Sequence, residues 1–342
     1  MIASQVSHQA NPADDRLLAS FLTLGFVSVA TYAVLHHELG PATIEALNLV
    51  IAIAGIYIFT RYSPFTPLQK ALFTLGYFPA YQYTAVSQNY AMGMLGVWAC
   101  CALAARRPVR MLALAVIIGL LAQVSIFGWI IGFALAVALL GDRLRRPDPT
   151  DAVAPGGRPW VPALVCAAAL TVALVVAWRA AHGANPTRWY FDLEQDRLLH
   201  IAQAVPVALL PFRDAGYQAW PVYARARESL PLIFGIVAWG FAALTAIGLL
   251  GRRRALVFYG LATGGLLAFF YLKWLGGVNY SGHLYVVLVA AIWLGRSQPA
   301  PDREGPVVRR AWALAGGAGL TVLLVAQAVA GLEAIAMSAP PR

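Results

Sequence analysis

Long apolar runs, separated by short clusters of arginine, constrain this chain more than any other feature of its sequence. The runs at 161–178 and 312–330 are close to the length that a helix needs to cross a hydrocarbon core of about 30 Å. Charged residues make up only 12% of the chain, whereas a soluble domain carries about 25%. The sequence therefore predicts an all-α, polytopic helical integral membrane protein, with residues 1–342 forming a single transmembrane domain.

The apolar runs divide the chain into about 11 expected spans, because the clusters of Lys and Arg mark connections between them. The positive-inside rule assigns these connections to the cytoplasm, including the linkers 142–160 and 296–311. The same rule accounts for the net charge of +10, so we expect contacts with membrane lipids and none with nucleic acid. The expected spans are 17–35, 44–60, 71–87, 91–105, 111–122, 125–141, 161–180, 231–250, 255–275, 283–295 and 312–331.

The run 111–140 decides the sidedness of the chain. It lies between the cationic stretches "RRPVR" (106–110) and "GDRLRRPDP" (141–149), which both face the cytoplasm only if the run enters the membrane and returns. Ser125 and Gly128 near its middle suit a tight reversal, and each half reaches only about 20 Å at the helical rise per residue. We therefore expect a pair of short or re-entrant helices here.

The extracytoplasmic side carries one sizeable loop, 181–230. Within it, "LEQDRLLHIAQAVPVALL" has an apolar side through Leu198, Ala202, Val205 and Leu209. A short helix with one apolar side is typical of a segment that lies along the membrane surface. We therefore expect an interfacial helix in this loop.

The extracytoplasmic turns also collect the side chains that a site for a lipid-borne phosphate needs. Cations would hold the phosphate, while a carboxylate acts as the base on an acceptor hydroxyl. The candidates are Glu38 and Asp192 for catalysis, Lys273, Arg188 and Arg179 for the donor phosphate, and Gln88, Asn89, Tyr90, Asn279, Tyr280 and His283 for lining the substrate pocket.

Each candidate has a structural interpretation that the sequence leaves open. Glu38 and Asp192 suit solvated charges, and Lys273 and Arg179 suit cations that extend to lipid headgroups. The polar residues at 88–90 suit hydrogen bonding between helices. The spacing of His, Cys, Asp and Glu supports no metal site, so we name no metal ligand.

The stretch "YQYTAVSQNYAMGMLGVWA" (81–99) resembles the segment "YxYxVxSRNYxLGxL" of membrane glycosyltransferases in the GT-C superfamily. The similar branch is related to the protein O-mannosyltransferases and the lipid A aminoarabinose transferases. Two further stretches, 48–78 and 266–294, agree in position. The resemblance implies a multi-pass enzyme of the bacterial inner (plasma) membrane with a GT-C-like core. Such an enzyme moves a sugar from a polyprenyl-phosphate carrier to an extracytoplasmic acceptor in the cell envelope, inverting the anomeric centre.

The resemblance also implies roles for individual residues. A carboxylate after the first span acts as base or metal ligand in this superfamily, which points to Glu38, with Asp192 as the substitute. A divalent metal is therefore admitted as a cofactor, although no ligand spacing supports one. Basic residues hold the donor phosphate, a role that we assign to Lys273 and Arg188.

The chain departs from the family pattern at its basic positions. Gln88 stands where the family has Arg, and Asn279 and Tyr280 stand where its late turn has Arg and His. Losing cations that stabilise a transferring phosphate typically costs factors of about 100 or more in rate. A second hypothesis is therefore a catalytically inactive GT-C-like membrane subunit or assembly factor with a membrane-protein partner. A third, a lipid or small-molecule transporter, would need ionisable residues in mid-span, which are nearly absent.

Overall fold

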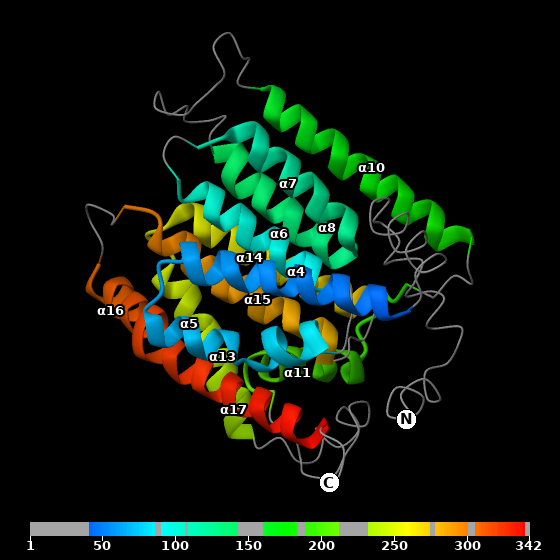
Figure 1. The fold of residues 1–342 in the computed structure, drawn as a ribbon. Coiled ribbons are helices and arrows are strands. Elements are labelled where there is room, and N and C mark those ends of the chain that lie inside the picture. Colours follow the sequence, from blue (N-terminus) through cyan, green and yellow to red (C-terminus); the bar gives the residue numbers. More distant parts are fainter. Residues whose placement is uncertain are drawn as a thin grey trace.

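The computed structural model describes residues 41–85, 90–106, 109–142, 160–183, 189–211, 232–273, 278–299 and 305–338. All regular secondary structure in these ranges is helical, as the sequence predicts (Figure 1). The expected first span, 17–35, lies outside them, as does most of the linker 142–160. The helices are α4 (Pro41–Tyr62), α5 (Pro67–Thr74), η1 (Tyr77–Ala85), α6 (Tyr90–Ala104), α7 (Met111–Val124), α8 (Ile126–Leu135), η2 (Ala136–Leu140), α10 (Val161–Gly183), α11 (Gln195–Leu209), α13 (Leu232–Gly248), α14 (Arg253–Leu272), α15 (Val278–Arg296), α16 (Pro306–Leu314), η3 (Ala315–Gly319) and α17 (Leu320–Ser338).

Four stretches of helix are long and apolar enough to cross a membrane. They are Glu45–Tyr62, Val161–Arg179, Arg253–Leu272 and Pro306–Ser338, the last of which joins α16, η3 and α17. Other apolar helices, such as α6 and α7, are shorter. The chain is thus all-helical in its described part and has helices suited to a membrane, whereas the number of about 11 spans stays a prediction. Because α16 begins at Pro306, the expected linker 296–311 is helical in its last third.

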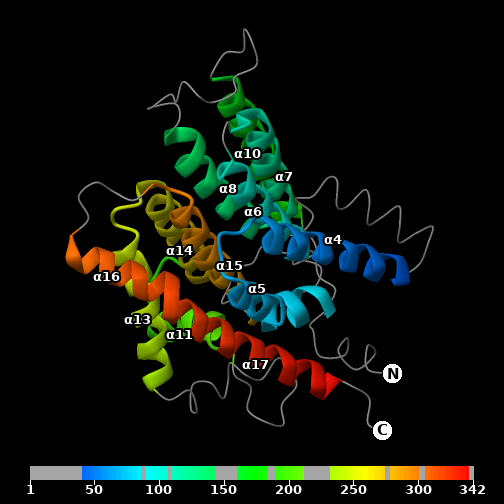
Figure 2. The same cartoon turned by 60° about the vertical axis from the view of Figure 1, so that its left-hand side comes forward.

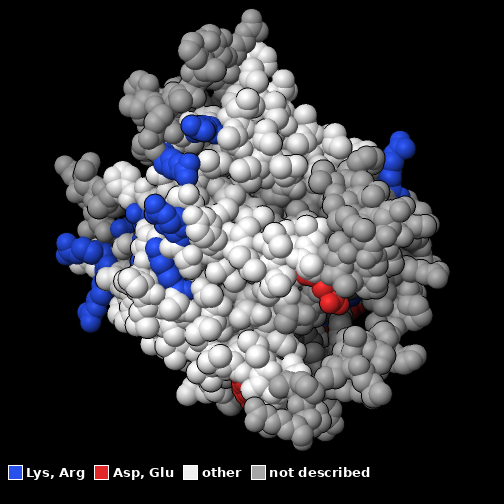
Figure 3. Space-filling model, in the orientation of Figure 1, with Lys and Arg blue, Asp and Glu red and all other residues white. Residues whose placement is uncertain are grey.

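Most of the described Lys and Arg side chains lie at one end of the helix bundle, on the left in Figure 3, and most of that view is uncharged. Figure 1, in the same orientation, shows this end formed by α16 and the adjacent ends of α4 and α14. We call it the basic end and the opposite one the far end. The basic end contains Arg61, Arg106, Arg110, Arg253, Arg254, Arg296, Arg309 and Arg310.

Residues 111–140 double back, as the sequence predicts. α7 ends at Val124, and Ser125 caps α8 by accepting a hydrogen bond from the Gly128 amide at 3.0 Å. The two helices pack closely, because a Cβ on Gly128 would lie 2.4 Å from the Leu121 carbonyl oxygen. α10 packs along α7 at the edge of the bundle (Figure 1). Both ends of this hairpin therefore return to the basic end.

The expected span 71–87 is not continuous. α5 and the π-helix η1 replace it, with a turn between them. Pro79 lies in η1 and lacks the amide hydrogen that a regular helix uses, which favours the wider π turn. α17 packs against the break, where a Cβ on Gly331 would lie 2.4 Å from the Leu75 carbonyl oxygen. The chain therefore changes direction where the sequence predicts a straight span.

α15 forms the centre of the bundle and is buried from residue 281 to residue 295. Near its basic end, Trp293 stacks on Trp98 of α6, with ring centres 5.9 Å apart. Phe59 of α4 packs its ring against both indoles and stacks on Phe73 of α5 at 3.8 Å. These rings join four helices, so the position of α15 is fixed at this end.

α11 lies in the loop where we expect an interfacial helix. Its first half carries exposed apolar side chains such as Leu198, whereas Ala204–Leu209 are all buried. α11 packs against α13 and α15, and the Gln327 side chain of α17 donates to the carbonyl oxygens of Ala208 (2.9 Å) and Leu209 (3.0 Å). Figure 2 shows α17 running beside α11 and α13, with α10 on the other side of the bundle. Only the first half of α11 therefore suits a membrane surface, and its second half belongs to the core.

Candidate functional site

Five aromatic side chains from four elements meet at the far end of the bundle. The His283 ring of α15 lies 4.8 Å from the Phe127 ring of α8, 5.2 Å from the Tyr90 ring of α6 and 6.0 Å from the Tyr83 ring of η1, measured between centres. Tyr280, one turn before His283, packs against Phe127 at 5.2 Å and Tyr90 at 6.1 Å. We call these five residues the His283 cluster. All of them are buried.

Hydrogen bonding fixes the orientation of the His283 ring. Its Nδ1 lies 2.9 Å from the Tyr280 carbonyl oxygen and donates to it, so in the neutral ring Nε2 is the acceptor. The Tyr83 hydroxyl is buried and has no hydrogen-bond partner among the described residues. A Cβ on Gly282 would lie 2.4 Å from that hydroxyl, so glycine is what allows Tyr83 to approach α15. The cluster thus holds polar atoms inside an aromatic enclosure.

A chain of amides continues from the cluster into η1. The Gln82 side chain donates to the Asn279 side-chain oxygen at 2.6 Å and accepts from the Tyr77 hydroxyl at 3.2 Å. The Asn48 side chain of α4 donates to the Tyr83 carbonyl oxygen at 3.1 Å. Carbonyl groups in the last turn of a helix have no hydrogen-bond donor within that helix. The Asn48 side chain supplies a donor for one such carbonyl group, that of Tyr83. Gln82 in the "YQYT" stretch is therefore paired within the protein, as is Thr84, whose hydroxyl donates to the Pro79 carbonyl oxygen at 2.5 Å.

A second group of polar residues lies where the segment 189–194 runs against the last turn of α14. The Tyr190 amide donates to the Leu272 carbonyl oxygen at 2.9 Å. The Tyr271 hydroxyl donates to the Asp192 carbonyl oxygen and accepts from the Glu194 amide at 3.0 Å. These bonds attach the non-helical segment 189–194 to α14, which is long enough to cross a membrane. They also place Asp192 beside the end of α14.

Lys273 follows α14 directly and lies in the same corner, which we call the Lys273 corner (189–194, 197 and 271–273). Its side chain is 7% exposed, and Nζ lies 4.8 Å from the centre of the Trp189 ring. Burial lowers the pKa of the Lys273 ammonium from its ordinary value. A cation held in this way over an aromatic face is less hydrated than a surface lysine, so it interacts more strongly with an anion that reaches it.

Arg197, on the first turn of α11, is the other buried cation of the Lys273 corner. Its guanidinium lies 3.3 Å from the centre of the Tyr190 ring and 3.4 Å from the Glu194 carboxylate, and it donates to the Tyr271 carbonyl oxygen. Sequence reasoning missed this residue, because an arginine in "LEQDRLL" is typical of a solvated helix face. Arg197 holds the corner together, and its charge is balanced by Glu194.

Phe127 connects the two groups. Besides contacting His283, its ring lies 5.7 Å from the Phe269 ring and 5.9 Å from the Phe270 ring, both on α14. Lys273 follows one turn later. The His283 cluster and the Lys273 corner therefore share the far end of α14. No sequence signal identifies Phe127, which belongs to an uninterrupted apolar run.

The candidates predicted from sequence divide into four sets. Tyr90, Tyr280 and His283 contact one another, and Asn279 lies beside them, bound to Gln82. The other candidates have different positions. Lys273 and Asp192 share the Lys273 corner, Arg179 is exposed on α10 at the edge of the bundle, and Glu38, Gln88, Asn89 and Arg188 lie outside the described residues.

A metal site receives no support from the part of the chain that the structure describes. Within it, no group of three or more His, Cys, Asp or Glu side chains is arranged to hold a metal ion. Comparisons with known proteins add nothing further, because no family model, no curated protein and no solved structure matches this chain. The functional interpretation therefore depends on the residues themselves and on the motifs in "YQYTAVSQNYAMGMLGVWA".

Proposed function

We propose that this chain is a multi-pass membrane glycosyltransferase with a GT-C-like core, which moves a sugar from a polyprenyl-phosphate carrier to an acceptor. The observation that carries the proposal is that Tyr90, Tyr280 and His283 meet in one cluster, which shares the far end of α14 with Lys273, opposite the basic end. The positive-inside rule turns the basic end toward the cytoplasm. The converging residues then face the extracytoplasmic side of a bacterial plasma membrane, where a lipid-linked sugar donor would reach them.

The proposed reaction is a displacement at the anomeric carbon. The acceptor hydroxyl oxygen bonds to that carbon as the bond from carbon to phosphate oxygen breaks, and the phosphate leaves with the electron pair. The acceptor proton passes to Glu38, or to Asp192 as the substitute base. Lys273 and Arg188 stabilise the charge of the departing phosphate, and the aromatic rings with Asn279 line the sugar pocket.

The test is turnover of polyprenyl-phosphate sugars by the full chain reconstituted in lipid vesicles. Glu38→Gln should abolish transfer while leaving the protein folded, because the amide cannot accept the proton. Glu45→Gln is the matched control, since Glu45 is exposed on α4. Transfer at the wild-type rate by Glu38→Gln would remove Glu38 from the mechanism and leave Asp192→Asn as the next variant.

A non-catalytic membrane subunit is the second candidate, favoured by one feature of the site. Asn279, which stands where the resemblance expects a cation, is bonded to Gln82 at 2.6 Å, and the His283 ring is enclosed by other rings. Such pairing stabilises a scaffold without providing a catalytic charge. Purification in native lipid separates the two candidates. A stoichiometric partner protein without any retained lipid-linked sugar favours the subunit.

A further inference from the structure

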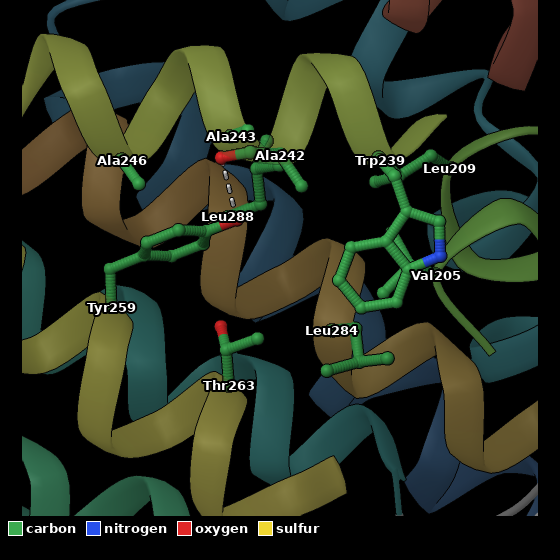
Figure 4. A pocket seen from close by; sticks show the side chains of 10 residues that line it. All are labelled: Val205, Leu209, Trp239, Ala242, Ala243, Ala246, Tyr259, Thr263, Leu284 and Leu288. Atoms are coloured by element: carbon green, nitrogen blue, oxygen red, sulfur yellow. Dashed lines mark hydrogen bonds between the residues drawn. The ribbon is translucent and has the colours of Figure 1, made fainter. Parts of the chain in front are cut away.

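An apolar cavity of about 220 Å³ lies between α13 and α14 (Figure 4). Figure 4 shows Trp239 of α13 and Leu284 of α15 at one side, with Tyr259 and Thr263 rising from α14. Tyr259 spans the gap between the two helices, because its hydroxyl donates to the Ala242 carbonyl oxygen at 3.3 Å. The buried second half of α11 closes the cavity toward the far end.

The wall of the cavity is almost entirely hydrocarbon. Among its lining residues, the Tyr259 hydroxyl and the Trp239 indole N–H are both engaged, the latter with the Ala202 carbonyl oxygen at 2.8 Å. The Thr263 hydroxyl points into the cavity and has no hydrogen-bond partner among the described residues. A helical threonine can turn its hydroxyl to a carbonyl of the preceding turn, so Thr263 does not require a polar ligand. The cavity therefore fits an apolar occupant.

The occupant would enter from the lipid phase. Trp239 and Ala243 line the cavity and are exposed at the surface of α13. Ile236 and Leu261 on the same two helices are also exposed. A surface of this kind lies against acyl chains when the helices cross a membrane. The volume is below the roughly 300–1,000 Å³ of pockets for whole small ligands, so it suits part of one chain.

Several arginine side chains lie at the basic end of the gap between α13 and α14. α16 crosses α13 there, because a Cβ on Gly248 would lie 2.8 Å from the Cα atom of Trp312. Arg252 stacks on the Trp312 ring at 4.1 Å and donates to the Gly248 carbonyl oxygen at 3.1 Å. This crossing brings α16, with its exposed Arg309 and Arg310, beside the end of α13.

The distance along α14 from the basic end to the cavity matches the hydrocarbon thickness of one membrane leaflet. Arg253 begins α14 at the basic end and is exposed, and Thr263 follows ten residues later. The helix rises about 15 Å between them. That is half of a hydrocarbon core of about 30 Å, so a headgroup at Arg253 would place its chain in the cavity.

We propose that the gap between α13 and α14 binds an anionic phospholipid of the leaflet at the basic end, with one acyl chain in the cavity and the phosphate held by Arg253, Arg309 and Arg310. Clusters of Lys and Arg at helix ends attract anionic headgroups, which gives the site its preference for charge. This binding does not depend on the proposed glycosyl transfer, because the residues proposed for transfer lie at the far end.

Native mass spectrometry of the purified full chain tests the site, with dioleoyl phosphatidylglycerol and dioleoyl phosphatidylcholine as probes. Wild-type protein should retain phosphatidylglycerol at least fivefold more than phosphatidylcholine. Ala243→Phe fills the cavity and should reduce retained phosphatidylglycerol about tenfold, with Ala243→Leu as the milder variant if the first fails to fold. Val237→Phe is the control, because Val237 is exposed on α13 but does not line the cavity.

Two further variants separate chain binding from headgroup binding. Arg309→Gln/Arg310→Gln should lower phosphatidylglycerol retention to the level of phosphatidylcholine, whereas Arg61→Gln, at the same end on α4, should not. Thr263→Val should leave retention unchanged, because the chain makes no hydrogen bond. Equal retention of both lipids by wild type, full retention by both Ala243 variants, or a loss in Thr263→Val that indicates a polar ligand would each overturn the proposal.

Discussion

The side-chain amide of Gln82 donates to the side-chain oxygen of Asn279 at 2.6 Å and thereby joins η1 to the first turn of α15. Gln82 is 3% exposed and Asn279 is partly buried, so the bond is shielded from solvent mainly on the Gln82 side. Both partners flank the His283 cluster, with Tyr83 following Gln82 and Tyr280 following Asn279. The position of the cluster therefore depends on a polar contact between segments 197 residues apart in sequence.

Gln82→Leu should lower the free energy of unfolding by about 1–3 kcal/mol, because it leaves the partly buried Asn279 oxygen without this donor and the Tyr77 hydroxyl without this acceptor. Adding Asn279→Leu should recover part of the loss, since both polar partners are then gone. Thermal unfolding of the detergent-solubilised protein measures both changes. Gln195→Leu, at an exposed position of α11, is the control. Equal melting temperatures for Gln82→Leu and wild type would show that the bond does not stabilise the fold.

Two glycines should respond to the same substitution with opposite signs. A Cβ on Gly282 would lie 2.4 Å from a Phe78 ring carbon and from the Tyr83 hydroxyl oxygen, so Gly282→Ala should destabilise the protein by about 1–3 kcal/mol. Gly260 on α14 is exposed, with no atom within 4 Å of an added Cβ. Gly260→Ala should stabilise by up to about 1 kcal/mol through helix propensity. A melting temperature of Gly282→Ala equal to or above that of wild type would contradict the packing of Tyr83 on α15.

Phosphate binding at the Lys273 corner should weaken as the pH rises, and at a lower pH than for an ordinary lysine. Burial lowers the pKa of Lys273, so the ammonium loses its charge before the usual pKa of about 10.4. A phosphate monoester is fully ionised above about pH 8, so the change reports the lysine. Titration of polyprenyl phosphate binding against pH measures it.

Variants of Lys273 identify the titrating group. Lys273→Arg should keep binding and remove the pH dependence, because arginine stays charged throughout this range. Lys273→Gln should bind weakly at every pH. If wild type and Lys273→Arg show the same pH profile, Lys273 does not hold the phosphate.

Arg296 should be a main stabilising residue of the basic end. It donates to the Pro64 carbonyl oxygen at 2.8 Å and to the Gly316 carbonyl oxygen, and so joins the end of α15 to the turn before α5 and to η3. Arg296→Leu should cost about 2–3 kcal/mol, since bonds from a charged donor are lost. Arg296→Lys should recover little, because one ammonium does not reproduce the guanidinium fork.

Arg110→Leu is the control for Arg296, because Arg110 is an exposed arginine at the same end. Limited proteolysis of the folded protein with trypsin should cut α16 after Arg309 or Arg310 faster in Arg296→Leu than in wild type or Arg110→Leu. Equal rates in all three proteins would mean that Arg296 does not hold α16 against the bundle.

The sequence predicts those helices best whose apolar runs are long. The expected spans 44–60, 161–180 and 255–275 correspond closely to α4, α10 and α14, because nothing within these runs interrupts a helix. The reversal at Ser125 was also predictable, since the charges on both sides restrict where the run can end. The break between α5 and η1 was not, because Pro79 is compatible with a kinked span as well as with a π turn.

Which side of a helix is buried in the protein is harder to predict from sequence than where the helices lie. The apolar side of α11 suits a membrane surface and a protein core equally, and the packing of its second half on α13, α15 and Gln327 separates the two. The same reason applies to the site. Tyr90, Tyr280 and His283 were identifiable as polar residues among apolar ones, but Phe127 and Arg197 become visible only when α8 and α11 are placed against α14.

The most direct test of the proposed glycosyl transfer is an experimental structure of the full chain with polyprenyl phosphate bound in a lipid nanodisc. Our account predicts phosphate density within hydrogen-bonding distance of Lys273 and Arg188, at the end of the bundle opposite Arg253 and Arg309. Phosphate density only at the basic end, or none at saturating ligand, would contradict it.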